Sequence, residues 1–200
     1  MKTMNKTIFK GIIMLLAAMA MTGCDSFLDI TPTGKVIAKT GKEYRALLTY
    51  EYKNFPEDRG LATLRGDEIT LDKTTTKAED YDSYFDIWAW NDLSQQSTTV
   101  SFGWRRYYHA IYIANYIIEN KDKITEATAD EINQLVGEAY MMRAYCHFLL
   151  VNLFAEPYTH CNAATTRGVP LSLKADVNAV LSCSSVEQVY QQVVDDVAKA

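Results

Sequence analysis

The fold is decided by residues 104–154, which read WRRYYHAIYIANYIIENKDKITEATADEINQLVGEAYMMRAYCHFLLVNLF. Large side chains recur in its first part at alternating steps of four and three residues, at Trp104, Tyr108, Ile111, Asn115 and Ile118. After a polar turn at 121–123, the same steps recur at Leu135, Ala139, Met142, Cys146, Leu149 and Leu153. This spacing is that of one face of an α-helix. Two long helices joined by a short polar loop are therefore predicted to pack antiparallel as an αα-hairpin.

Small side chains at four positions of this stretch predict a close approach of the two helices: Ala110, Ala114, Ala139 and Ala144. Such a hairpin resembles a tetratricopeptide-like unit, although the sequence shows no repeat of it at a period of about 34 residues. The predicted fold class is therefore all-α, with tetratricopeptide-like helical hairpins and long irregular loops.

Capping boxes predict where the helices begin. Thr40-x-x-Glu43 opens a helix expected over 41–53, and Pro56 should end it because the residue before a proline disfavours the helical conformation. Thr128-x-x-Glu131 opens the second helix of the hairpin. The segments 56–98 and 156–183 are predicted to be irregular, and the first of them is rich in both aspartate and aromatic residues.

A third capping box, Ser184-x-x-Glu187, predicts a last helix. Its inner face is expected to carry Val186, Val189, Tyr190, Val193 and Val197. The helical pattern is still in phase at Ala200, with no glycine or proline to end it. We therefore expect the chain to be a fragment of a longer protein; a terminal helix docked onto the hairpin would give the same pattern.

The N-terminus predicts an export signal over residues 1–23. Lys2, Lys6 and Lys10 form a basic start, and an apolar stretch from 11 to 21 follows that is too short to span a bilayer. Small residues precede Cys24, as in a lipoprotein signal peptidase site, so Cys24 is the predicted lipid attachment residue. Acyl chains such as palmitate on this cysteine would anchor the protein to a membrane. Residues 24–40 are expected to form an extended tether, and 41–200 the helical domain.

Charge and cysteine count bound the remaining possibilities. The net charge of −5 becomes −8 when the three lysines of the signal leave, which argues against nucleic acid as a partner. With Cys24 lipidated, Cys146, Cys161 and Cys183 remain. Cys146 lies in a helical apolar pattern, so Cys161–Cys183 is the one disulfide that the sequence leaves open.

Candidate ligand-binding residues lie between 65 and 92. Sugar rings stack their C–H faces on aromatic rings and form hydrogen bonds with amide, carboxylate and guanidinium groups. Segment 88–92 offers both kinds of group and Arg65-Gly66-Asp67-Glu68 the polar kind, so the candidates are Trp88, Trp90, Asn91, Asp92, Arg65 and Asp67. The competing interpretation places at least one tryptophan in the core, since alternation over 87–90 would put both indoles on one face.

Other polar residues are assigned structural roles. Arg143 is expected to pair with a carboxylate or cap a neighbouring helix, and Glu138 to be structural as well. His109, His147 and His160 are isolated, and no spacing typical of zinc ligands occurs, so no metal or other cofactor is predicted. No G-x-S-x-G, H-E-x-x-H or P-loop motif occurs either, and the many carboxylates show no spacing that singles out a catalytic pair. The sequence predicts no enzyme.

An ordered set of motifs resembles one family. It comprises Cys24-x-x-Phe27-Leu28-Asp29, Trp104-x-x-x-Tyr108-x-x-Ile111-x-x-x-Asn115, Gly137-Glu138-Ala139-x-x-x-Arg143-Ala144-Tyr145, Phe148-x-Leu150-Val151-x-Leu153-Phe154-Ala155-Glu156-Pro157, Gly168-Val169-Pro170-Leu171 and Ser185-Val186-x-x-Val189-Tyr190 with Asp195-Asp196. In this order they look like the N-terminal part of the SusD/RagB family of outer-membrane nutrient-binding lipoproteins. Ala155-Glu156-Pro157 departs from the family's usual Gly-x-x-Pro turn.

The resemblance implies a surface-exposed lipoprotein of the cell outer membrane. Such proteins cap a SusC/RagA-type TonB-dependent transporter and bind an oligosaccharide, or in some members a peptide, for uptake; they are not enzymes. The family's glycan binders use an aromatic platform that comes partly from this N-terminal region. Members are considerably longer than this chain, and their C-terminal half supplies much of the ligand-binding surface. The alternative is a helical-repeat scaffold of the envelope that binds protein partners and no small ligand.

Overall fold

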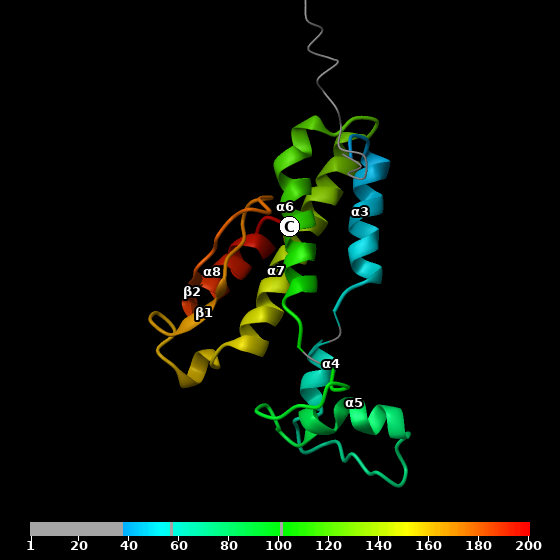
Figure 1. Ribbon diagram of the computed structural model, residues 1–200. Coiled ribbons are helices and arrows are strands. Elements are labelled where there is room, and N and C mark those ends of the chain that lie inside the picture. The colour runs from blue at the N-terminus through cyan, green and yellow to red at the C-terminus, as the bar shows by residue number, and fades with distance from the viewer. Residues whose placement is uncertain (1–37, 57, 101) are drawn as a thin grey trace, which may run out of the picture. The chain divides into compact units, whose positions relative to one another are not determined.

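A computed structural model describes residues 38–56, 58–100 and 102–200 (Figure 1). Its elements are α3 (Gly41–Lys53), α4 (Asp58–Thr63), α5 (Ala78–Trp88), α6 (Arg105–Asn120), the 3-10 turn η1 (Lys121–Lys123), α7 (Ala129–Phe154), the 3-10 turn η2 (Tyr158–His160), β1 (Arg167–Pro170), β2 (Cys183–Ser185) and α8 (Val186–Val197). The predicted signal peptide, Cys24 and most of the predicted tether lie outside these residues. No helix among the described residues is long and apolar enough to cross a membrane.

Helices α6 and α7 form the predicted αα-hairpin and run side by side (Figure 1). The four small residues expected at the close approach, Ala110, Ala114, Ala139 and Ala144, are all buried. The α7 stripe is buried from Leu135 to Leu149, as predicted, and the capping box of Thr128 and Glu131 is present. The mainly helical fold class predicted from these residues is confirmed.

The buried face of α6 agrees with the predicted stripe at Ile111 and Asn115 and differs from it elsewhere. Trp104 is exposed and Tyr108 only half-buried, whereas Tyr107 and Ile113, which lie off the stripe, are buried. Both α3 and α7 pack against α6, so the surface that it buries is wider than one stripe and is rotated towards α3. A single apolar stripe describes a helix with one neighbour, and α6 has two.

Helix α3 begins and ends at the predicted residues. Thr40 Oγ1 accepts the Glu43 N–H at 3.3 Å, and Glu43 Oε2 accepts the Thr40 N–H at 2.9 Å, so two backbone donors at the helix start are satisfied. Tyr44 is buried and its ring stacks on that of Tyr116 with centroids 5.6 Å apart. The contact joins α3 to α6.

The last residues of the predicted tether belong to the folded body. Ala38 is buried, and the Thr125 N–H donates to the Lys39 carbonyl at 2.9 Å. The Gly41 N–H donates in turn to the Thr125 carbonyl at 2.9 Å. A Cβ at position 41 would lie 2.6 Å from the Cβ of Ala127, so only glycine allows α3 to start this close to the segment before α7.

The prediction that 56–98 is irregular is wrong over two stretches, since α4 and α5 form there. The N-cap residue of α5, Lys77, makes no side-chain capping bond, so the start signal was absent. Glu79 and Asp80 in the first turn complement the positive end of the helix instead. The aromatic residues of α5 do follow helical spacing, but aspartates between them obscure the pattern.

The start of α8 is also one residue later than predicted. Ser185 Oγ accepts the Gln188 N–H at 3.2 Å, and Gln188 Oε1 accepts the Ser185 N–H at 2.9 Å, so the capping box uses Ser185 and not Ser184. Ser184 is instead part of β2, which pairs antiparallel with β1 in a two-stranded sheet within the predicted irregular segment. The pairing of β1 with β2 places Ser184 in a strand, so Ser185 is the residue that caps α8. Sequence alone does not show this pairing because each strand has four residues or fewer.

The inner face of α8 is only partly as predicted. Val186 and Val189 are buried, whereas Val197 is exposed and Asp196 is fully buried in its place. Helix α8 packs along α7. The thiols of Cys146, Cys161 and Cys183 are all free, so the disulfide that the sequence left open is not formed.

Asp196 can be buried because it forms an ion pair with Arg143 of α7. The Arg143 guanidinium donates to both Asp196 oxygens, from Nε at 2.7 Å and from Nη2 at 2.6 Å. Its Nη1 donates to Asn115 Oδ1 of α6 at 2.7 Å. The Asn115 amide donates onward to the carbonyls of Ser172 and Lys174 at 3.0 and 3.1 Å. One network therefore joins α6, α7, α8 and the segment after β1, and the predicted pairing of Arg143 with a carboxylate is confirmed.

We expect replacement of Arg143 by methionine to lower the free energy of unfolding by about 3–5 kcal/mol, because Asp196 would keep a buried charge without its partner. Urea denaturation followed by circular dichroism measures this loss. Arg45→Met is the matched control: it removes an ion pair to Glu138 whose side chains are 37% and 27% exposed, and should cost at most about 1 kcal/mol. Equal losses in the two variants would contradict the central role of the Arg143 network.

A second prediction concerns His147, which is fully buried on α7 with Nε2 accepting the Ser172 N–H at 3.4 Å. Burial, helped by the positive charge of Arg143, lowers the pKa of His147 from 6.5 to about 4. Between these values the unfolded chain binds a proton that the folded chain does not, so stability falls as the pH drops from 6.5 towards 4. We expect a loss of about 2 kcal/mol between pH 7 and pH 5.

Denaturation of the His147→Gln variant at the same two pH values checks the assignment. Without the imidazole, this part of the pH dependence should vanish. His160→Gln serves as the control, because His160 is exposed and its removal should leave the slope unchanged. The same slope in His147→Gln as in the unmodified chain would show that another group is responsible.

Candidate functional site

The C-terminus of α5 places Trp90 in an unusual backbone conformation. The Asn91 N–H donates to the Asp86 carbonyl at 2.8 Å and the Trp90 N–H to the Ile87 carbonyl at 3.2 Å, which is the Schellman pattern of a helix end. The pattern needs a left-handed residue, usually glycine, and here Trp90 supplies it with φ 57°. The left-handed conformation costs a non-glycine residue about 1–2 kcal/mol. A bulky residue in a strained backbone conformation suggests a functional role for its side chain.

The Trp90 side chain is 62% exposed and lies against Arg65. The Arg65 Cζ atom is 4.8 Å from the centre of the Trp90 ring and 5.4 Å from that of Phe102, so the guanidinium contacts two aromatic rings. It also pairs with the Asp92 carboxylate. Arg65 Nε is buried and has no hydrogen-bond acceptor among the described residues. We call Arg65, Trp90 and Asp92 the tryptophan cluster.

The loop that follows Trp90 is held in place by the side chain of Asp86. This carboxylate is buried and accepts three hydrogen bonds, from Thr99 Oγ1 at 2.6 Å, the Gln96 N–H at 2.7 Å and Asn91 Nδ2 at 2.9 Å. These donors, Thr99 foremost, hold the pKa of Asp86 below its usual value. The carboxylate is therefore charged at neutral pH and fixes the course of residues 91–99.

The other predicted site residues are placed differently. Asn91 uses its amide to hold the loop, donating to Asp86 and to the Ser94 carbonyl. Trp88 is half-buried on α5 and donates its Nε1–H to the Ile69 carbonyl at 3.0 Å. Asp67 is exposed and forms no recorded contact with the tryptophan cluster. Of the six candidates, the structure thus brings Arg65, Trp90 and Asp92 together.

The predicted alternation of Trp88 and Trp90 on one face is wrong, because α5 extends to Trp88 and the chain reverses at Trp90. Trp88 is the tryptophan with a structural role, in line with the expectation that at least one would have it. Asp86 and Phe102 were not among the predicted site residues. Nothing in the spacing distinguishes Asp86 from the other aspartates of this segment, and Phe102 lies outside the candidate segment 65–92.

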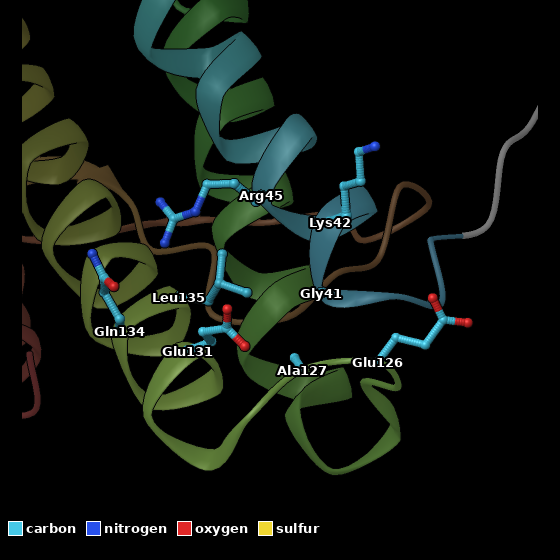
Figure 2. A pocket seen from close by; sticks show the side chains of 8 residues that line it. All are labelled: Gly41, Lys42, Arg45, Glu126, Ala127, Glu131, Gln134 and Leu135. Carbon is cyan, nitrogen blue, oxygen red and sulfur yellow. The ribbon is translucent and has the colours of Figure 1, made fainter.

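A pocket of about 340 Å³ lies where the N-terminal ends of α3 and α7 meet (Figure 2). Figure 2 shows Lys42 and Arg45 coming from α3, and Glu131 and Gln134 from α7. Two of its four charged side chains already have partners, since Arg45 pairs with Glu138 at 2.7 Å and Glu131 caps α7. This pocket is therefore explained by the packing of the helix ends.

No group of three His, Cys, Asp or Glu side chains among the described residues could hold a metal ion. His109 pairs with Glu51 at 3.0 Å, and His147 is part of the buried core. The tryptophan cluster offers an exposed ring, a guanidinium and a carboxylate within one small surface. These are the groups that bind the faces and hydroxyl edges of sugars.

Comparison with known proteins gives curated relatives of similar sequence and solved structures of similar fold. "SusD-like protein P38" of Formosa agariphila is 24% identical over 203 residues, which cover 98% of this chain and 37% of the relative. "SusD-like protein P25" of the same organism is 26% identical over 127 residues, which cover 64% of this chain and 24% of the relative. The chain thus spans well under half the length of the curated relatives that it matches.

Solved structures share the fold. A SusD superfamily protein from Bacteroides thetaiotaomicron superposes with a TM-score of 0.58 at 24% identity, covering 78% of this chain and 36% of that one. A protein from Bacteroides vulgatus, described as a putative sugar binding protein, gives a TM-score of 0.65 at 20% identity over 82% of this chain and 37% of that one. The family model SusD-like_3, described as "Starch-binding associating with outer membrane", matches residues 27–200. The chain therefore belongs to the SusD/RagB family.

Proposed function

We propose that this chain is part of a cell-surface lipoprotein that binds a nutrient oligosaccharide and delivers it to a SusC-like TonB-dependent transporter of the outer membrane. The lipid would be attached to Cys24, which lies outside the described residues. Family membership supports the class of ligand, since the matching family is described as starch-binding and outer-membrane associated. The proposed transporter partner and surface location rest on the family resemblance.

The observation that carries the proposal is the strained backbone of Trp90 together with its exposed side chain. Its backbone is held in a conformation that costs free energy, and yet its indole, which lies against Arg65, remains largely open to solvent. A residue selected for stability at a helix end would be glycine. A flat apolar ring beside a guanidinium and a carboxylate suits a sugar, whose ring stacks while its hydroxyls reach Arg65 and Asp92. This role is binding and needs no catalytic group.

The alternative is a scaffold that binds protein partners, and one observation favours it. Several large apolar side chains of α7 and α8 are exposed, namely Met141, Tyr145, Phe148 and Val194. Exposed apolar residues that gather on neighbouring helices are typical of protein contacts. The two proposals differ in what Trp90 does, because a scaffold that uses α7 and α8 has no need of it.

We expect Trp90→Gly to weaken glycan binding without destabilising the fold. Glycine relieves the left-handed backbone, which should offset the lost contact with Arg65 and keep the free energy of unfolding within about 1 kcal/mol of the unmodified chain. Binding should weaken by about tenfold or more. Affinity electrophoresis in gels that contain soluble starch, xylan or pectin measures the retardation of each variant.

Leu93→Ala is the matched control for this experiment. Leu93 lies in the same loop and is 99% exposed, so it tests the loss of an exposed apolar side chain that is not part of the tryptophan cluster. It should be retarded like the unmodified chain. If no polysaccharide of the panel retards the unmodified chain, or if Trp90→Gly binds as well as it does, the scaffold is the better interpretation.

Asp86→Ala should weaken glycan binding indirectly. The variant loses all three hydrogen bonds that hold residues 91–99, so the loop that positions Asp92 should become mobile. Hydrogen exchange should then be faster at Gln96, whose N–H donates to Asp86. Asp82→Ala, one turn earlier and exposed, is the control and should leave both exchange and binding unchanged. Unchanged exchange at Gln96 in Asp86→Ala would refute this role.

A further inference from the structure

A second pocket, separate from the tryptophan cluster, lies between the end of α3 and the start of α6. Its volume is about 290 Å³, and it is lined by Tyr50, Glu51, Asn54, Arg105, Arg106 and His109. Ligand pockets begin at about 300 Å³, so this one fits a single sugar residue or a small ion and not a long chain. None of its residues was singled out as a binding residue in the sequence.

The pocket concentrates positive charge in an acidic chain. Arg105 and Arg106 are both exposed, whereas the chain as a whole has a net charge of −5. No carboxylate of the described residues lies within ion-pair distance of either arginine. The charge of each guanidinium is therefore not offset by a carboxylate, and an oxyanion in the pocket would supply the missing partner.

The one acidic residue of the pocket is already engaged. Glu51 is 5% exposed, and its Oε1 lies 3.0 Å from His109 Nδ1. The imidazole therefore donates its Nδ1–H to Glu51, which fixes the ring and leaves Nε2 to face away from the carboxylate. The charge of Glu51 is satisfied inside the protein, and the exposed side of the pocket keeps the basic groups.

The N-terminal end of α6 adds to this field. Arg105 and Arg106 are its first two residues, and the N-cap residue Trp104 makes no side-chain capping bond. The helix is 16 residues long and so has a dipole of several turns. The positive end of this dipole lies beside the two arginines, and no capping side chain neutralises it.

We infer that this pocket is a subsite for an oxyanion, the carboxylate or sulfate ester of an acidic sugar residue. Arg105 and Arg106 bind the oxyanion through charge-assisted hydrogen bonds. Tyr50 is exposed beside them and offers a ring for the sugar face, and the Asn54 amide oxygen can accept from a hydroxyl. The assignment of the oxyanion to a sugar rests on the proposed function, whereas the oxyanion contact itself does not.

Nuclear magnetic resonance titration of the isotope-labelled full chain tests the inference. The probes are sodium glucuronate, sodium sulfate and glucose, at constant ionic strength. We expect glucuronate and sulfate to shift the signals of Arg105, Arg106 and His109, and glucose to leave them unchanged. Tighter binding of glucuronate than of sulfate is expected if the sugar ring contacts Tyr50.

The double variant Arg105→Gln/Arg106→Gln should bind glucuronate at least about tenfold more weakly, because both charge-assisted hydrogen bonds are lost. Lys121→Gln/Lys174→Gln removes the same charge from exposed positions outside the pocket and should bind like the unmodified chain. The shifts of Trp90 report on the fold of the double variant, since they should match those of the unmodified chain.

Three results would overturn the inference: equal shifts by glucose and glucuronate, no shift by either anion, or unchanged affinity in the arginine variant. Binding of sulfate and glucuronate with equal affinity would retain the oxyanion subsite and overturn its assignment to a sugar. Failure of the glycan proposal is seen separately, in the polysaccharide gels with Trp90→Gly, and leaves the response to sulfate untouched.

Discussion

The structure depends on one buried ion pair, between Arg143 of α7 and Asp196 of α8. Removing two charges from water is costly, and the attraction between them offsets that cost only when the remaining donors and acceptors are satisfied. Here they are: Asp196 also accepts from Gln192 at 2.9 Å, and Arg143 donates its third hydrogen bond to Asn115. The pair therefore fixes one arrangement of the helices, because any shift of α8 along α7 would leave a buried charge alone.

Asn115 extends this constraint into the segment after β1. Its amide oxygen faces Arg143 and its nitrogen faces two backbone carbonyls, so a single side chain joins the charged core to a stretch without regular structure. His147 holds the same segment through the Ser172 N–H. The buried polar residues of this protein thus position its irregular parts, while the apolar residues of α3, α6 and α7 supply the bulk of the core.

The tryptophan cluster depends on local hydrogen bonds at the end of α5 and not on the buried ion pair. Asp86 accepts hydrogen bonds from the loop, and its backbone carbonyl closes the helix end that turns Trp90 outwards. One residue therefore sets both the helix terminus and the course of the chain after it. Local hydrogen bonding at the end of α5 offsets the left-handed backbone of Trp90, which is how a strained residue persists at an exposed position.

The helices of the hairpin, the start and end of α3 and the structural role of Arg143 were predictable from the sequence. Each depends on contacts between residues a few positions apart, or on a charge that burial obliges to find a partner. Three of the six candidate site residues, Arg65, Trp90 and Asp92, lie together. The sequence shows which side chains have groups suited to sugars but not how they are arranged, and the binding role of these three stays a prediction.

Only the tertiary structure decided the rest. The face that α6 buries depends on two neighbouring helices, and the start of α8 depends on the pairing of β1 with β2 across the loop 171–182. The choice of Asp196 as the partner of Arg143, and the contact of Arg65 with Phe102, likewise join distant residues. Local spacing determines which segments become helices, whereas the burial of particular side chains is a property of the neighbours that the folded chain brings to them.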